Sequence, residues 1–220
     1  MTFNTAYALP EVIRAVSGKA HGTLSEKRFV RFLLLDSRQL IAPESTLFFA
    51  IKTKKNDGHL YVWELLQKGV RTFVVQNLER NWVDNYPDAC FIQHENPLAA
   101  LQSLARHHRR KNNPEVLGVT GSNGKTIVKE WLHQLLYEEK QVVRSPKSFN
   151  SQIGVPLSVW LIEPQHELGI FEAGISRPGE MEKLQQILDP HVGVFTNIGS
   201  AHDEGFISTS QKIEEKLRLF

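Results

Sequence analysis

One stretch constrains the fold more than any other, the segment VLGVTGSNGKTIVKEW at residues 116–131. An apolar, strand-like run leads into a glycine-containing loop, and an amphipathic pattern follows. A strand, a tight loop and a helix bring backbone N–H groups together at a helix N-terminus, where they bind phosphate. Glycines let the backbone approach the anion, a lysine can reach the β- and γ-phosphates, and a hydroxyl can ligate Mg²⁺. We therefore expect a nucleotide-binding loop made by Gly121, Ser122, Asn123, Gly124, Lys125 and Thr126.

This loop differs from the common phosphate-binding pattern G-x-x-x-x-G-K-[ST]. That pattern requires glycine at position 119, where the chain has Val119. The spacing of the glycines is shorter here, which indicates a distinct class of loop. In the helix that follows, helical periodicity predicts a buried face made of Ile127, Trp131 and Leu135, with Val128 and Leu132 beside it.

The rest of the back half alternates strand-like and helix-like segments. Strands are predicted around VLGVTG, QVVRS, LGIFEAG and HVGVFTNIG, with helices between them. Such alternation is typical of a parallel sheet covered on both faces. The turn residues NNP at 112–114 suggest a domain boundary. The expected fold class is α/β, with a small mixed N-terminal domain (1–113) and part of a P-loop-type parallel-sheet ATP-binding domain (114–220).

Composition narrows the partners and the compartment. The net charge is only +2, and the basic run Arg106 to Lys111 ends a predicted helix, where the helix dipole favours cations. Neither feature favours nucleic acid as a partner. Cys90 is the only cysteine, the N-terminus lacks the pattern of a signal peptide, and no apolar run approaches about 20 residues. We expect a cytoplasmic protein without a membrane span.

Five stretches, in order along the chain, carry a resemblance to one family. These are DSR with LFFAIKTKKNDGH (36–38 and 47–59), the loop at 118–126, FNSQIGVPLS (149–158), FEAGISRPGEM (171–181) and TNIGSAHDEGF (196–206). Together they resemble the Mur ligase superfamily, whose members use ATP to join an amine to a carboxylate. Within that superfamily, the sequences of these stretches most resemble the branch that adds D-alanyl-D-alanine to UDP-N-acetylmuramoyl-tripeptide, in a form fused to an alanine racemase.

The resemblance implies a reaction and a set of residues. ATP and Mg²⁺ would convert the tripeptide carboxylate to an acyl phosphate, which the amine of D-alanyl-D-alanine then attacks. Lys125, Glu172, His202 and Lys216 would be catalytic, and Asn150 would lie near the γ-phosphate. Thr126, Glu172, His202 and Lys216 would serve the metal, with Lys216 carbamylated. The UDP-sugar would be bound by Ser37, Arg38, Asp57, Gly58 and His59.

Less specific interpretations stay open for several of these residues. Glu172 could be a solvated carboxylate at a strand end, Lys216 a surface lysine, and DSR a turn with an exposed arginine. The chain could also be another amide ligase of the superfamily, similar to folylpolyglutamate synthase, or a nucleotide-binding module without ligase activity. Because nothing follows the last predicted helix, we expect the natural protein to continue, and residues 1–220 alone to show negligible ligation. Which amino acid is third in the tripeptide, and the oligomeric state, do not follow from the sequence.

Overall fold

The computed structural model describes residues 5–199 and 205–220. The chain divides into two compact units, residues 1–104 and 105–220. The division falls inside helix α4 (Pro97–Asn112), whereas the turn chemistry places the boundary just after this helix. Among the described residues, no helix has the length and apolar character needed to cross a bilayer.

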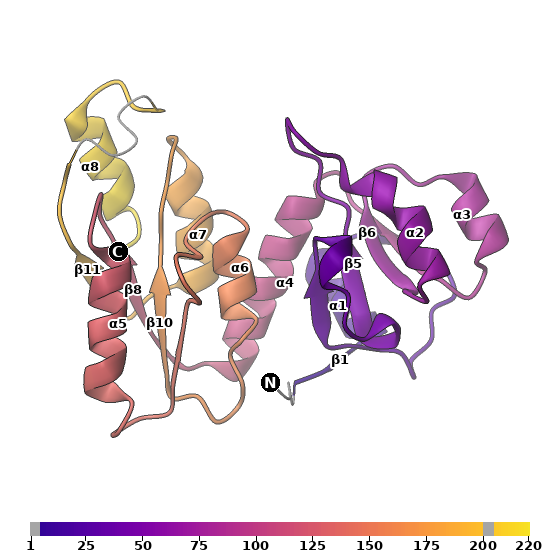
Figure 1. Cartoon of the computed structure of the whole chain (residues 1–220), viewed down its shortest axis with the longest axis horizontal. Helices are drawn as coiled ribbons and strands as arrows, with labels where there is room; N and C mark the ends of the chain where they lie inside the picture. The colour runs from indigo at the N-terminus through magenta and orange to yellow at the C-terminus, as the bar shows by residue number, and fades with distance from the viewer. Residues whose placement is uncertain (1–4, 200–204) are drawn as a thin grey trace. The chain divides into compact units, whose positions relative to one another are not determined.

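The first unit is built on a five-stranded sheet (Figure 1). Its strand order is β2-β7-β6-β5-β4. Strands β4 (Phe32–Leu34), β5 (Thr46–Phe49), β6 (Thr72–Val75) and β7 (Cys90–Gln93) run parallel to one another. Strand β2 (Lys19–Gly22) pairs with β7 in the antiparallel sense and forms one edge. A separate antiparallel pair joins β1 (Tyr7–Ala8) to β3 (Phe29–Val30).

Helices and short 3₁₀ turns connect these strands. They are α1 (Leu9–Val16), η1 (Ser37–Gln39), η2 (Pro43–Ser45), η3 (Gly58–Tyr61), α2 (Val62–Gln67) and α3 (Arg80–Asn85). The core is aromatic, because the Phe91 ring stacks with both Phe73 and Trp82. Cys90 lies in this core as a fully buried thiol, and burial raises its pKa to about 11.

Helix α4 begins and ends at residues whose chemistry suits those positions. Asn96 Oδ1 accepts hydrogen bonds from the N–H groups of Leu98 and Ala99, which caps the N-terminus, and Pro97 is the first helical residue. The basic C-terminal end has a structural use. Arg109 is buried and donates hydrogen bonds to the carbonyl oxygens of Leu188 and Asp189.

The second unit contains a four-stranded, all-parallel sheet, as the alternation of segments predicts. Its order is β11-β8-β10-β9. The strands are β8 (Glu115–Thr120), β9 (Val142–Arg144), β10 (Leu168–Glu172) and β11 (Val192–Phe195). The carboxyl ends of β8 and β10 are aligned by the pairing of Val119 with Glu172. Side chains that follow these two strands therefore meet at one edge of the sheet, where open parallel sheets bind their ligands.

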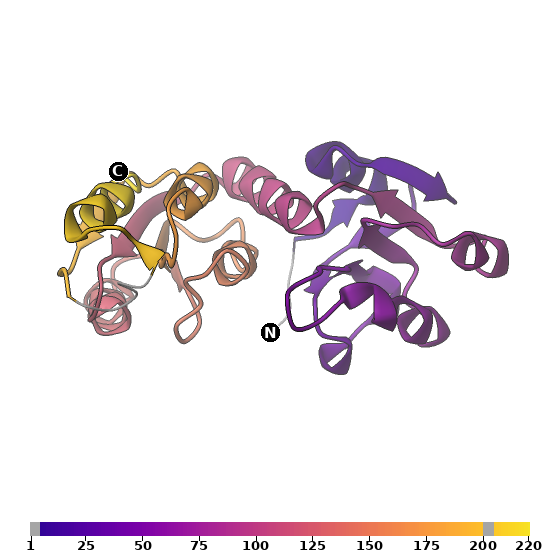
Figure 2. The same ribbon diagram turned by 90° about the horizontal axis from the view of Figure 1, so that it is seen from above.

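Helices cover both faces of this sheet. Helix α5 (Lys125–Leu136) lies on one side, while α7 (Glu180–Leu188) and α8 (Thr209–Leu217) lie on the other (Figure 2). The core on the α7 side also includes residues of α4 and of α6 (Gly154–Val159).

The predicted buried face of α5 is wrong in part. Val128, Leu132 and Leu136 pack against Val119, Leu168 and Ile170 of the sheet. The neighbouring stripe of Ile127, Trp131 and Leu135 is instead 57%, 63% and 73% exposed. Both stripes are apolar and have helical spacing, so periodicity alone cannot decide which of them faces the sheet.

Candidate nucleotide site

The loop between β8 and α5 has the geometry of an anion site. Gly121 and Gly124 have φ angles of 137° and 79°, which favour glycine. A Cβ on Gly121 would lie 2.0 Å from Thr196 Oγ1. The N–H groups of Gly124, Lys125 and Thr126 donate to no acceptor in the described part of the chain. They stand at the N-terminus of a twelve-residue helix, where unpaired donors and the helix dipole favour an anion.

The segment after β11 holds the first half of this loop in place. Ser122 N–H donates to the carbonyl oxygen of Asn197, and Asn123 N–H donates to Asn197 Oδ1 at 3.0 Å. Thr196 Oγ1 donates to the carbonyl oxygen of Asn123, and Ser122 Oγ donates to that of Gly199. The donors of residues 122 and 123 are thus used within the protein, and those of residues 124–126 remain for a ligand.

Three lysines surround the loop. Lys125 Nζ donates to the carbonyl oxygens of Gly121 and Ser122, at 2.8 and 3.1 Å. Lys216 Nζ, from α8, donates to the same Gly121 carbonyl at 3.1 Å. Lys212, one turn earlier on α8, donates to the carbonyl oxygen of Gly199. Lys212 and Lys216 are only 1% and 2% exposed, so neither is a surface lysine.

Burial and mutual repulsion set the acidity of these groups. Burial lowers the pKa of Lys216 to about 8, and the charges of Lys125 and Lys212 add to the shift. The pKa of Lys125 is also lowered by burial, while the Glu172 carboxylate acts in the opposite direction. Such a concentration of positive charge near free backbone donors suits a polyphosphate.

Glu172 ends β10 beside the loop and is fully buried. Thr126 Oγ1 donates to Glu172 Oε2 at 3.2 Å, and Asn150 Nδ2 reaches the same oxygen at 3.4 Å. Among the described residues, none donates a well-aligned hydrogen bond to Glu172 Oε1, although Lys129 Nζ is 3.1 Å away. Burial excludes the interpretation of Glu172 as a solvated strand-end carboxylate, because a buried charge needs a partner.

This donor set fits Mg²⁺. The metal prefers oxygen ligands at 2.0–2.1 Å in an octahedron, so adjacent ligand oxygens are about 2.9 Å apart. The hydroxyl of Thr126 and Oε2 of Glu172 are close to that separation. Residues 5–199 and 205–220 contain no cluster of three or more His, Cys, Asp or Glu side chains that could hold a metal. An ion held by Thr126 and Glu172 would take further oxygen ligands, such as water and phosphate oxygens, to complete its preferred coordination. His202, which was also predicted to bind the metal together with Lys216, lies outside the described residues.

The residues predicted to bind a UDP-sugar are part of local structure in the first unit. Asp36 caps η1 and pairs with Arg38, which lowers the pKa of Asp36 to about 2, and Ser37 between them is buried. The Arg38 side chain is 86% exposed. This arrangement matches a strand-end turn with a surface arginine and leaves the guanidinium accessible to a ligand.

The second predicted group, residues 57–59, forms a tight turn. Asp57 Oδ1 accepts from His59 N–H and lies 2.7 Å from His59 Nδ1. His59 Nε2 accepts from the N–H of Gln76 at 3.0 Å, so both ring nitrogens have partners in the protein. A Cβ on Gly58 would lie 2.8 Å from the Cα of Ala50, which explains glycine at that position.

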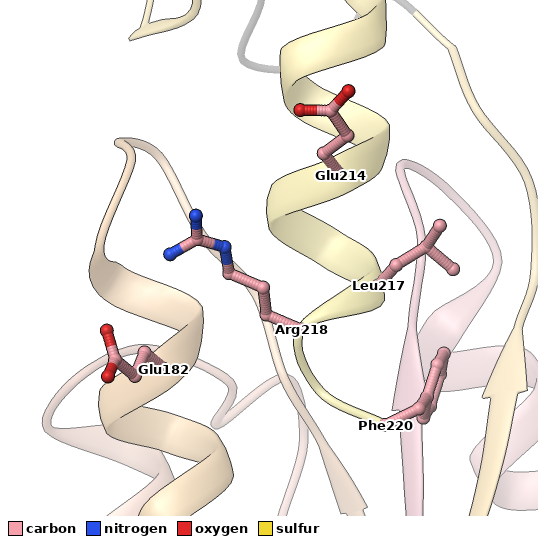
Figure 3. Close-up of a pocket in the computed structure, with 5 residues that line it drawn as sticks. All are labelled: Glu182, Glu214, Leu217, Arg218 and Phe220. Atoms are coloured by element: carbon pink, nitrogen blue, oxygen red, sulfur yellow. The ribbon is translucent and has the colours of Figure 1, made fainter.

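A surface hollow elsewhere in the second unit is a different feature. It is lined by Glu182 of α7 and by Glu214, Leu217, Arg218 and Phe220 at the end of α8 and beyond it (Figure 3). None of these residues belongs to the loop or to the group around Glu172. The candidate site is therefore defined by the hydrogen-bonded side chains at the sheet edge.

Two lysines and an asparagine near the loop were not predicted as site residues. Lys129 is fully buried and contacts Glu172, Lys212 bonds Gly199, and Asn197 bonds the loop. Lys129 had a detectable signal, because it lies four residues after Lys125 and hence on the same side of the helix. The partners of Lys212 and Asn197 are distant in sequence, and no local pattern indicates them.

Comparison with known proteins identifies relatives of both units. Residues 119–220 match the family of the Mur ligase middle domain. The chain is 38% identical over 218 residues to the UDP-N-acetylmuramoyl-tripeptide–D-alanyl-D-alanine ligase of Treponema pallidum, covering 96% of the chain and 47% of the relative. It is 30% identical over 215 residues to the ligase of the same name from Bacillus subtilis, covering 96% and 46%.

Solved structures agree with this likeness. MurF ligase from Thermotoga maritima, in complex with ADP, has a TM-score of 0.77 and 32% identity, covering 86% of the chain and 43% of that protein. MurF from Acinetobacter baumannii has a TM-score of 0.90 at 24% identity, covering 99% and 47%, and supports the fold alone. The chain spans about half the length of the curated relatives it matches.

Proposed function

Because the chain belongs to the Mur ligase family, we propose that it is the nucleotide-binding portion of an amide ligase that adds D-alanyl-D-alanine to UDP-N-acetylmuramoyl-tripeptide. The second unit would bind ATP and Mg²⁺, and the first would bind the UDP-sugar. The observation that supports this most strongly is the meeting of Lys125, Thr126 and Glu172 at the carboxyl ends of β8 and β10.

The proposed reaction has two steps, phosphorylation of the carboxylate and attack of the amine. An oxygen of the tripeptide carboxylate attacks the γ-phosphorus of ATP, so an O–P bond forms and the bond to ADP breaks. The neutral amine of D-alanyl-D-alanine then attacks the acyl carbon, and a C–N bond forms. The C–O bond to phosphate breaks, phosphate leaves with the electron pair, and the nitrogen loses a proton to give the amide. The protein's contribution is to position the reactants and neutralise charge.

Each residue of the loop has a distinct part in that positioning. The N–H groups of residues 124–126 would hold the β-phosphate, and Lys125 would turn from the loop carbonyls to the phosphate oxygens. Thr126 and Glu172 would hold Mg²⁺, which supplies neutralisation of the phosphate charge when bound. Asn150, already at Glu172 Oε2, is placed to fix the orientation of that carboxylate.

Lys216 would act as a carbamate. Its amine adds to CO₂ and loses a proton, and this turns a cation into an anionic oxygen ligand. The low pKa of about 8 supports this proposal, because only the neutral amine reacts with CO₂. His202 would join Lys216 at the metal, as the family resemblance implies.

Calorimetric titration tests the proposal. The chain should bind ATP more tightly with Mg²⁺ than in EDTA, and Lys125→Ala should weaken ATP binding by about 10-fold or more, since one charge-assisted contact contributes about 1.5–3 kcal/mol. Lys140→Ala is the matched control, because Lys140 is ion-paired with Glu115 at the surface. Equal ATP affinity in the two variants would contradict the assignment of the loop.

Calorimetric titration with other ligands distinguishes the proposed ligase from the alternative functions. UDP-N-acetylmuramoyl-tripeptide should bind to the chain, and Arg38→Ala should weaken that binding, because the Arg38 side chain, although paired with Asp36, is exposed and accessible to a diphosphate. Retention of a folate in place of the UDP-sugar would favour a different amide ligase. ATP binding without either ligand would favour a nucleotide-binding module.

A further inference from the structure

Lys129 is a buried cation that the proposed function leaves unused. It lies on α5 one turn after Lys125, and its side chain is 0% exposed. A lysine is almost never fully buried unless it is paired. Its ammonium group therefore needs a structural or functional explanation.

The ammonium group of Lys129 joins three parts of the second unit. It lies 3.1 Å from Glu172 Oε1 at the end of β10. It also donates to the carbonyl oxygens of Ser145 and Lys147, at 2.8 and 2.5 Å, in the connection that leads from β9 towards Asn150. An ammonium has three N–H donors. Two are thus used by this connection, and the third is left for a carboxylate.

Two carboxylates are within reach of that third donor. Glu130 Oε1 is 3.0 Å from Lys129 Nζ, but Glu130 has a second cation, since Arg144 Nε lies 2.9 Å from its Oε2. Glu172 has no other ion pair within 4.0 Å among the described residues, and it is 0% exposed. Lys129 is therefore the cation in direct contact with Glu172, and Lys125 interacts with the same carboxylate from farther away.

The two oxygens of Glu172 face different partners as a result. Oε1 faces Lys129, while Oε2 accepts from Thr126 Oγ1 and Asn150 Nδ2. Because the carboxylate is planar, a cation fixed at Oε1 also fixes the direction of Oε2. The tether from Lys129 to Ser145 and Lys147 places the same restraint on the segment that carries Asn150.

We propose that Lys129 is a positioning residue for the Mg²⁺ site: it holds Glu172 so that Oε2 alone is presented to the metal beside Thr126. This inference rests on the proposed function. Residues that orient a metal ligand typically contribute about 10- to 100-fold to metal affinity. The effect of Lys129 should therefore appear only when Mg²⁺ is present.

The test measures Mg²⁺ affinity without any turnover. Binding of a fluorescent ATP analogue is followed first in EDTA and then as Mg²⁺ is added. Lys129→Met removes the charge and the hydrogen bonds, whereas Lys129→Gln removes the charge but keeps a donor for Ser145 and Lys147. Lys140→Met is the control, since it breaks the ion pair of Lys140 with Glu115 at the surface. Both Lys129 variants should raise the half-saturating Mg²⁺ concentration about 10- to 100-fold, with unchanged affinity in EDTA.

Each other outcome has a defined meaning. Unchanged or tighter Mg²⁺ binding in both variants overturns the inference, since Lys129 would then be neutral towards the metal or compete with it. Equal weakening with and without Mg²⁺, or loss of the folded state in both variants, assigns a purely structural role and also overturns it. Failure of the unmodified chain to bind the ATP analogue removes the proposed function itself. If the unmodified chain binds the ATP analogue with Mg²⁺ and the Lys129 variants bind it equally well, this inference alone is overturned.

Discussion

Substitution of Gly121 by alanine should destabilise the second unit far more than the same change at Gly124. Both glycines belong to the phosphate-binding loop, and both have positive φ angles, 137° and 79°. Their surroundings differ. A Cβ at position 121 would meet Thr196 Oγ1 at 2.0 Å and the Asn197 backbone at 3.1 Å, whereas a Cβ at position 124 has nothing within 4 Å.

The magnitude follows from two contributions. Alanine in a backbone region reserved for glycine costs about 1–3 kcal/mol, and forced overpacking costs about 1–3 kcal/mol more. Gly121→Ala should therefore lower the free energy of unfolding by about 2–6 kcal/mol. Gly124→Ala carries only the cost of a left-handed backbone, about 1–2 kcal/mol.

Urea denaturation with hydrogen-exchange mass spectrometry can measure the two variants. Peptides from β8 and β10 report on the second unit, which matters because a two-unit chain need not unfold in one step. A stability loss for Gly121→Ala no larger than that for Gly124→Ala would refute the packing argument. It would mean that Thr196 and Asn197 do not hold the loop as described.

Three further predictions concern other parts of the second unit. Because burial lowers the pKa of Lys216 to about 8, its ¹³C-labelled carbamate, observed by NMR with ¹³C-bicarbonate, should decline as the pH falls below about 8 and the amine is protonated. Asn197→Ala removes the acceptor for Asn123 N–H, a hydrogen bond that contributes about 0.5–1.5 kcal/mol to holding the loop in its binding conformation. Calorimetry should therefore show ATP affinity falling about 2- to 12-fold. Arg109→Ala should reduce the free energy of unfolding by about 3–6 kcal/mol, since two charge-assisted hydrogen bonds to the last residue of α7 and to its C-cap are lost at about 1.5–3 kcal/mol each. The exposed Arg110→Ala is the control and should change it by about 0.5 kcal/mol or less, as urea denaturation can measure.

The parallel sheet of the second unit could be predicted because its strands are short apolar runs separated by helical segments. Each such run has to be covered on both faces, and few arrangements achieve that. The edge strand β2 could not be predicted in the same way. Its residues, KAHG, lack apolar alternation, and its position depends on antiparallel pairing with β7, far along the chain. The exposed stripe of α5 was misassigned because two adjacent stripes are both apolar.

Part of the candidate site was predictable for a similar reason. Lys125 and Thr126 follow from the loop pattern, and Glu172 follows from its place at the end of a neighbouring parallel strand. The burial of Lys129 depends on three contacts that only the folded chain brings together. Those contacts convert an ordinary lysine of a helix into the cation in direct contact with the predicted metal ligand.

The single cysteine makes opening of the first unit measurable by thiol labelling. Cys90 is fully buried, with a pKa raised to about 11, so a thiol reagent reaches it only in molecules whose first unit has opened. The second unit contains no cysteine. The rate of thiol labelling therefore reports on opening of the first unit alone. A nucleotide bound to the second unit would lower this labelling rate only through energetic coupling between the units. Labelling with and without the nucleotide would therefore measure that coupling directly.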